Sequence, residues 1–95
     1  MILLTPEAIA DIERLREFLG AENPAAARRA MQTIWSAYEK LRVFPELGRP
    51  TEDTDIRQVV IRFGATGYVS RYTIVPGSGD ILILWIWHGR ETRPE

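Results

Sequence analysis

The sequence predicts an α+β domain in which an N-terminal helical hairpin packs on one face of a small antiparallel sheet, in the order β-α-α-β-β-β. The first half of the chain carries two apolar stripes at helical spacing, each preceded by a capping residue and a proline. From residue 56 onward the apolar pattern has the two-residue period of strands and is interrupted by two glycine-containing turns. Helices in one half and consecutive strands in the other are typical of this fold class.

Two helices are expected in the first half of the chain. Thr5-Pro6-Glu7 offers a capping hydroxyl, a proline for the first turn and a carboxylate at the positive end of the helix dipole. The stripe that follows stops at Gly20, which predicts a first helix over residues 6–19. Asn23-Pro24 repeats the start signal, and the second stripe ends near Phe44-Pro45. The link between the stripes is so short that the helices must form an antiparallel hairpin.

Three strands are expected in the second half. They cover residues 56–63, 68–75 and 80–87, and the turns at 64–67 and 76–79 connect them as an antiparallel meander. The last of these segments is apolar on both alternating faces. This pattern is typical of a central strand rather than an edge strand.

Two further segments complete the predicted fold. Residues 1–4 are apolar and directly precede a capped helix, so they are expected to add an edge strand to the sheet. The segment 45–50 breaks the helical period, and the acidic, polar stretch 51–55 is expected to form an exposed loop. A chain of 95 residues is long enough for one domain, which we expect to span residues 1–95.

Composition limits the possible functions. The chain has no cysteine, which excludes disulfides, thiolate metal sites and a cysteine nucleophile. Its longest apolar run is too short to cross a bilayer, so a cytoplasmic protein without membrane association is expected. The net charge of -1 and the pI of about 5.8 argue against nucleic-acid binding by the whole surface. Charge is uneven, however, because residues 57–90 carry four arginines and one aspartate while residues 1–23 carry five acids and two arginines.

Few residues suggest catalysis. The three serines have no nucleophile-elbow context and only one histidine to serve them, so a serine triad is not supported. That histidine, His88, stands at the polar exit of the last predicted strand. It either acts as a general acid or base near neutral pH or hydrogen-bonds the neighbouring loop. One histidine, no cysteine and scattered carboxylates predict no metal and no cofactor.

Two groups of side chains in the predicted sheet leave alternatives open. Trp85 and Trp87 lie two residues apart, so alternation places them on the face of Ile81 and Ile83. They either pack in the core or form an exposed aromatic strip that receives a partner. The sheet arginines are either solubilising rim charges or a cluster that grips phosphate or a carboxylate-rich partner. These arginines are Arg57, Arg62, Arg71 and Arg90.

Short motifs spread over nearly the whole chain resemble the toxins of the ParE/RelE superfamily, the growth-arresting partners in bacterial toxin-antitoxin pairs. Each motif is weak alone, and their order and spacing make the combination specific. The resemblance implies the α+β layout described above. The residues that carry it are Thr5-Pro6-Glu7-Ala8, Asp11-Ile12, Asn23-Pro24-Ala25-Ala26-Ala27, Leu41, Pro45, Leu47-Gly48-Arg49-Pro50, Arg57, Tyr72, Ile83-Leu84 and His88-Gly89-Arg90.

The resemblance leaves two activities to compare. RelE-like members cut messenger RNA on the ribosome with several basic side chains on the sheet, whereas ParE-like members poison DNA gyrase. Arg62 and Arg90 match two basic positions of the nuclease pattern, but Val60 and Val69 stand where further basic residues are expected. Trp85 also stands where ParE-like relatives commonly have arginine. Loss of half the cationic set disfavours cleavage, because the transition state needs proton transfer and charge stabilisation.

The resemblance therefore implies a ParE-like toxin of a type II toxin-antitoxin system. Such a toxin acts on DNA gyrase and is stored in a hetero-oligomer with its cognate antitoxin. The alternative is a ribosome-dependent mRNA endoribonuclease, and a third possibility is an interaction module without toxicity. The expected partner-binding residues are Arg57, Arg71, Trp85, Trp87 and Arg90, and the candidate catalytic residues for the nuclease alternative are Arg62, Arg71, His88 and Arg90.

Overall fold

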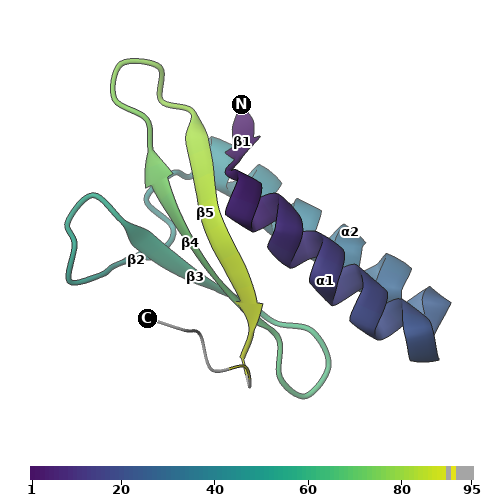
Figure 1. Cartoon of the computed structure of the whole chain (residues 1–95). Coiled ribbons are helices and arrows are strands. Elements are labelled where there is room, and N and C mark those ends of the chain that lie inside the picture. The colour runs from purple at the N-terminus through teal and green to yellow at the C-terminus, as the bar shows by residue number, and fades with distance from the viewer. Residues whose placement is uncertain (90, 92–95) are drawn as a thin grey trace.

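The two predicted helices form and lie side by side as a hairpin on one side of the sheet (Figure 1). The computed structural model describes residues 1–89 and 91. Within them, α1 spans Pro6–Glu22 and α2 spans Pro24–Val43. Both predicted helix starts are confirmed.

Side-chain caps explain where these helices begin and end. The hydroxyl of Thr5 accepts a hydrogen bond from the backbone N–H of Ala8 at 3.1 Å. Asn23 serves both helices, because its N–H donates to the carbonyl of Leu19 and its side-chain oxygen accepts from the N–H of Ala26. The prediction that the first helix stops at Gly20 is wrong, since Asn23 provides the stop three residues later.

Five strands build the sheet, in the spatial order β1-β5-β4-β3-β2. The predicted meander is confirmed, because β3, β4 and β5 pair antiparallel in sequence order. The predicted N-terminal strand is also present, but it runs parallel to β5 and makes the sheet mixed. A two-residue strand that the sequence did not predict, β2, pairs with the start of β3. The bounds are β1 Ile2–Leu4, β2 Arg49–Pro50, β3 Arg57–Ile61, β4 Tyr68–Ile74 and β5 Ile81–His88.

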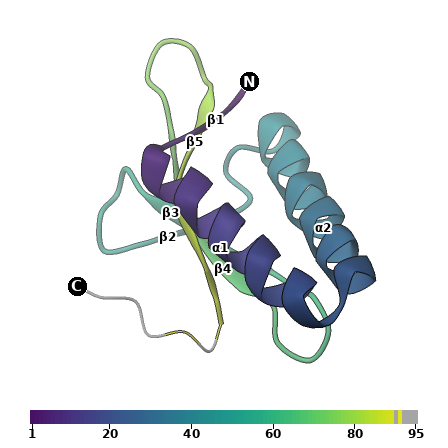
Figure 2. The ribbon, with the colours of Figure 1, turned by 45° about the vertical axis from the view of Figure 1, so that its right-hand side comes forward.

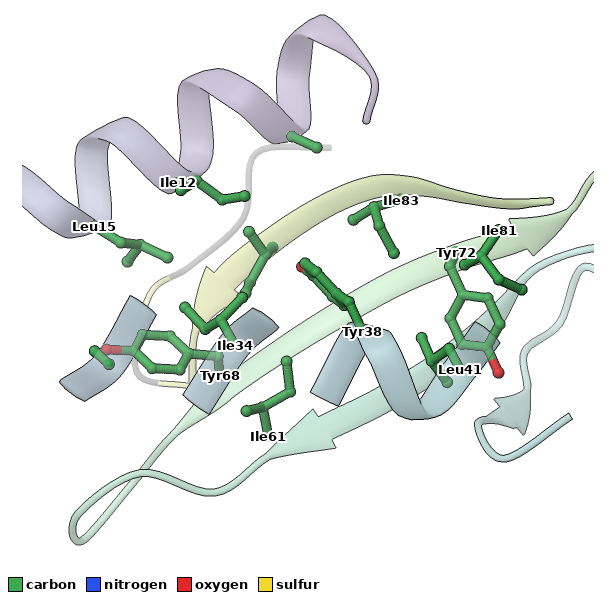
Figure 3. Close-up of a cluster of buried hydrophobic side chains, with 13 residues drawn as sticks. Ile12, Leu15, Ile34, Tyr38, Leu41, Ile61, Tyr68, Tyr72, Ile81 and Ile83 are labelled. Atoms are coloured by element: carbon green, nitrogen blue, oxygen red, sulfur yellow. The ribbon is translucent and has the colours of Figure 1, made fainter. Parts of the chain in front are cut away.

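Figure 2 shows the hairpin against one face of the sheet. The core side chains lie between the two layers. Apolar side chains from both helices meet those of the three long strands there, and the close-up in Figure 3 shows them pointing toward one another. The opposite face of the sheet has no helix against it in the described part of the chain (Figure 1). Buried members include Ile12, Leu15, Ile34, Tyr38, Leu41, Ile61, Tyr68, Tyr72, Ile81, Ile83 and Ile86.

A β-bulge in β5 changes which side chains face this core. Arg71 of β4 lies opposite Trp85, whereas the next residue, Tyr72, lies opposite Ile83, so Leu84 has no residue across from it. The extra residue reverses the alternation beyond that point. Ile83 and Ile86 are both fully buried, and Trp85 lies on the other face. The prediction that the two tryptophans share a face with Ile81 and Ile83 is therefore wrong.

α1 lies along the part of β5 that the short strand β1 leaves uncovered. β1 covers β5 only as far as Ile83, and α1 packs along β5 beyond it. The carboxylate of Asp11 on α1 accepts a hydrogen bond from the buried N–H of Ile86 at 3.1 Å. This contact satisfies a strand amide that would otherwise be buried without a partner.

Candidate functional site

The face of the sheet that turns away from the hairpin carries both tryptophans and one of the arginines singled out in the sequence. Paired residues in neighbouring strands share a face, so Trp85 stands beside Arg71, and Trp87 beside Val69. Arg71 in turn stands beside Gln58 of β3. All five side chains are only partly buried. We call Gln58, Val69, Arg71, Trp85 and Trp87 the open-face strip.

Arg71 occupies the middle of the open-face strip and is held from three sides. Its Nε donates to Oε1 of Gln58 at 3.0 Å, and one terminal nitrogen donates to Oε1 of Glu52 at 3.1 Å. The guanidinium carbon lies 5.6 Å from the centre of the Trp85 ring, within the range of a cation–π contact. The Glu52 side chain is 78% exposed, so a carboxylate of a partner could replace it without a large desolvation cost.

Trp87 is tied to α1 through an arginine that the sequence analysis did not single out. The guanidinium carbon of Arg14 lies 4.8 Å from the centre of the Trp87 ring. Arg14 also pairs with Asp11 at 2.7 Å and with Glu91 at 3.2 Å, and Glu91 accepts from the backbone N–H of His88 at 2.7 Å. A carboxylate within the apolar stripe of the first helix, with an arginine three residues later, was the available signal for this network.

His88 lies on the opposite face from the tryptophans. Its Nε2 is 2.9 Å from the hydroxyl oxygen of Thr66, and its ring meets that of Tyr68 edge-on with centroids 5.8 Å apart. Burial raises the pKa of Tyr68. The hydrogen bond to the β3–β4 turn agrees with the second of the two roles considered for this histidine. An apolar groove of about 540 Å³ adjoins it, with Phe18, Leu19 and Phe63 in its lining.

Arg57 holds the segment between α2 and β2. Its terminal nitrogen donates to the carbonyls of Glu46 at 3.2 Å and of Gly48 at 2.7 Å. In the same segment, the hydroxyl of Tyr72 donates to the carbonyl of Pro45 and accepts from the N–H of Gly48. A Cβ on Gly48 would lie 2.7 Å from the Tyr72 ring, so this position requires glycine. Arg57 thus has a structural role here, whatever it adds to binding.

The candidate catalytic residues do not share a site within the described residues. Arg71 lies on the open face, His88 faces the hairpin, and Arg62 is exposed just beyond the end of β3. Arg90, which was expected both to bind a partner and to take part in cleavage, lies outside the described residues. The two hollows lined by Arg62 contain neither Arg71 nor His88, and the groove beside His88 contains neither arginine.

Comparison with known proteins agrees with this fold. The family described as "ParE toxin of type II toxin-antitoxin system, parDE" matches residues 2–93. The chain belongs to the ParE toxin family. Toxin RelE3 of Caulobacter vibrioides is 37% identical to this ParE-family chain over 90 residues, which is 95% of each protein. Toxin RelE1 of the same organism is 34% identical over 92 residues, covering 97% of the chain and 96% of that toxin.

A solved structure supports the same architecture for this ParE-family toxin. The structure titled "Chromosomal ParDE TA system from P. aeruginosa" contains a chain that superimposes with a TM-score of 0.74 and covers 92% of both chains. The sequence identity is 21%, so this likeness concerns the fold. Together the relatives identify a type II toxin of the ParE/RelE superfamily and leave its target open.

Several residues that carry the family resemblance have structural roles in this toxin. Thr5 and Asn23 cap helices, Gly48 gives room to Tyr72, and Asp11 accepts a hydrogen bond from a backbone N–H of β5.

Among the described residues, no three acidic or histidine side chains are grouped as a metal site would require. Neither helix in the described part has the length and apolarity needed to span a bilayer.

Proposed function

We propose that this ParE-family toxin arrests growth by binding and inhibiting DNA gyrase, and that a cognate antitoxin holds it inactive in the cytoplasm in a hetero-oligomer. The observation that supports binding over cleavage is the separation of Arg62, Arg71 and His88 among the described residues. Attack by a ribose hydroxyl needs an acid, a base and cations around one phosphate. A sheet face with aromatic rings and an arginine is better suited to holding another protein.

The open-face strip is the surface we assign to partner binding. Trp85 and Trp87 offer large apolar area, and Arg71 can form paired hydrogen bonds with a carboxylate once Glu52 is displaced. Tryptophan and arginine are the residue types that most often dominate binding energy at protein interfaces. An antitoxin segment with acidic and apolar residues would therefore cover the strip. Arg57 and Arg90 remain proposed contacts of the same partner.

The proposed activity is tested by assaying the purified toxin, separated from its antitoxin, on two substrates. We expect it to inhibit supercoiling by gyrase and to leave messenger RNA intact in a translating extract. The toxin-antitoxin complex serves as the control and should be inactive in both assays. Codon-dependent cuts in translated mRNA with unaffected gyrase would instead favour ribosome-dependent cleavage. This activity is the second candidate because two relatives are named RelE.

A charge reversal tests the proposed surface. Arg71→Glu should weaken binding of the antitoxin about tenfold at low salt and make the remaining affinity less dependent on salt, because an attractive pair becomes repulsive. Arg28→Glu on the exposed start of α2 changes the net charge equally and should bind like the wild type. Isothermal titration across a salt series, with circular dichroism to confirm folding, makes the comparison. Equal affinity of both variants at every salt concentration would remove Arg71 from the interface.

A further inference from the structure

One edge of the sheet is only half covered. β2 pairs with β3 at Arg57 and Gln58, and no strand in the described part of the chain continues that pairing alongside Val59–Ile61. The N–H of Thr51 donates to the carbonyl of Ile56, which assigns the backbone groups of residues 56, 58 and 60 to the β2 side of the strand. The N–H and C=O of Val60 therefore point out of the sheet at its uncovered edge.

The side chains at this edge make it attractive to a partner. Val60 is 62% exposed, although natural proteins usually protect such edges with charged or bulged residues. A groove of about 500 Å³ runs between this edge and α2. The groove is bordered by Leu47 and by polar side chains of α2, including Ser36 and Lys40.

The charge around the edge has one sign. Lys40 lines the groove on the α2 side, Arg62 follows the strand, and Arg49 lines the adjoining hollow on the β2 side. Among the described residues that line either hollow, none is acidic. These three cations form no ion pair with any residue that the structure describes.

We infer that the uncovered edge of β3 binds an extended, acidic segment of a partner protein, which adds a strand beside Val59–Ile61. Backbone hydrogen bonds to Val60 would fix its register, and carboxylates flanking an apolar residue would meet Lys40, Arg49 and Arg62. The inference rests on the proposed function, in that the partner is the antitoxin and this edge is a second contact beyond the open-face strip. Two-fold pairing with a second copy is disfavoured, because it would gather the same cations of both chains along one seam.

Amide hydrogen exchange gives the direct readout. In the free toxin the N–H of Val60 should exchange quickly, and in the purified toxin-antitoxin complex it should become strongly protected. The N–H of Ile61, which points toward β4, should be protected in both states. Fast exchange of the Val60 amide in the complex would overturn the inference. Protection in the free toxin that rises with its concentration would also overturn it, because a second copy would then be the occupant.

Substitutions at the edge give an independent test. Val60→Pro removes the outward N–H and leaves the bonds to β4 intact, so it should lower antitoxin affinity about tenfold. The matched control Val60→Thr keeps the N–H and the branched side chain and should bind within about twofold of the wild type. Lys40→Glu should lower the affinity and its salt dependence, whereas Arg28→Glu should not.

The results separate this inference from the proposed function. If the wild-type toxin forms no complex with the antitoxin, the proposed function fails. If the complex forms and Val60→Pro, shown to be folded by circular dichroism, binds as tightly as Val60→Thr, only the edge inference fails. Should Val60→Pro fail to fold, the exchange experiment on the wild-type complex still decides.

Discussion

Ser70 shows how a fully buried hydroxyl can be satisfied in a small core. Its Oγ donates to the carbonyl of Trp85 at 2.9 Å and lies 2.9 Å from the hydroxyl of Tyr38. Because the hydroxyl proton of Ser70 is used on that carbonyl, Tyr38 must be the donor between the two side chains. The three groups link α2, β4 and β5 in one chain of hydrogen bonds at the position where the bulge disturbs the strand pairing.

Stability should therefore fall in alkali. Burial raises the pKa of Tyr38, Tyr68 and Tyr72, whereas tyrosines of the unfolded chain ionise near pH 10. Above about pH 10 the unfolded state has lost protons that the folded state keeps, so the free energy of unfolding decreases as pH rises, and below that pH this contribution is fully present.

Tyr38→Phe tests this at one residue. The variant should lose about 1 kcal/mol at pH 7, because one buried hydrogen bond disappears while Ser70 keeps its acceptor. Its stability should then decline less steeply than that of the wild type in alkali. Urea unfolding between about pH 7 and pH 11 measures both effects. Parallel curves for the two proteins would contradict the assignment of Tyr38 to the alkaline loss.

At the scale of the element, the bulge at Leu84 determines which side chains of β5 face the core and which lie on the open face. A regular strand of the same sequence, with Leu84 paired in the ladder, would place Trp85 and Trp87 toward the helices and Ile86 toward solvent, because a shift of one residue moves every side chain to the other face. The observed arrangement keeps the compact isoleucines under the hairpin. It leaves the two largest side chains of the strand on the open face.

Deletion of Leu84 should remove the bulge and keep both tryptophans on the open face, because Ile83 opposite Tyr72 would then be followed directly by Trp85 opposite Arg71. The cost should be about 1 kcal/mol, because the hydrogen bond from the hydroxyl of Thr5 to the carbonyl of Leu84 is lost. Leu84→Ala keeps the residue count and only trims a partly buried side chain. Thermal unfolding followed by tryptophan fluorescence compares the two variants. A deletion variant whose tryptophan emission shifts to that of fully buried rings would contradict this assignment of the two faces.

At the scale of the whole molecule, the hairpin covers one face of the sheet and leaves the other available for partners. The backbone at the end of β5 is fixed, since the N–H of Gly89 donates to the carbonyl of Gly67 at 2.9 Å. The Arg14 and Glu91 network holds the same corner to α1. The family motif His88-Gly89-Arg90 thus begins on a rigid support, the kind of place where proteins present functional side chains.

Arg90→Ala should relieve growth arrest without loss of stability. Arg90 follows this strand end in the sequence, and we expect its guanidinium to contact the target rather than to stabilise the fold. Induced expression without antitoxin measures toxicity, and thermal unfolding of the purified variant measures stability. Arg16→Ala on the exposed face of α1 is the matched control and should remain toxic. An unfolded Arg90→Ala protein, or a folded one with full toxicity, would rule out this role.

The sequence was a reliable guide where the signals are local. Helix starts at Thr5 and Asn23 follow from caps and prolines, and the meander follows from alternation and glycine turns. The parallel direction of β1, the short β2 and the bulge at Leu84 depend on partners distant in sequence, so alternation alone could not reveal them. For the candidate site, the sequence predicted the residue types and not their arrangement in space. Alternation along β5 divides these residues between two faces, and the bulge decides which face each of them takes.

The pairing of β1 with β5 also sets the order in which the molecule can assemble. The hydroxyl of Thr5 donates to the carbonyl of Leu84, 79 residues further along the chain, and β5 lies between β1 and β4. Until β5 has been synthesised, the first strand has no neighbour and α1 lacks the strand along which it packs. Long-range contacts of this kind slow folding. We therefore expect a nascent chain that still lacks its last strand to be neither folded nor toxic.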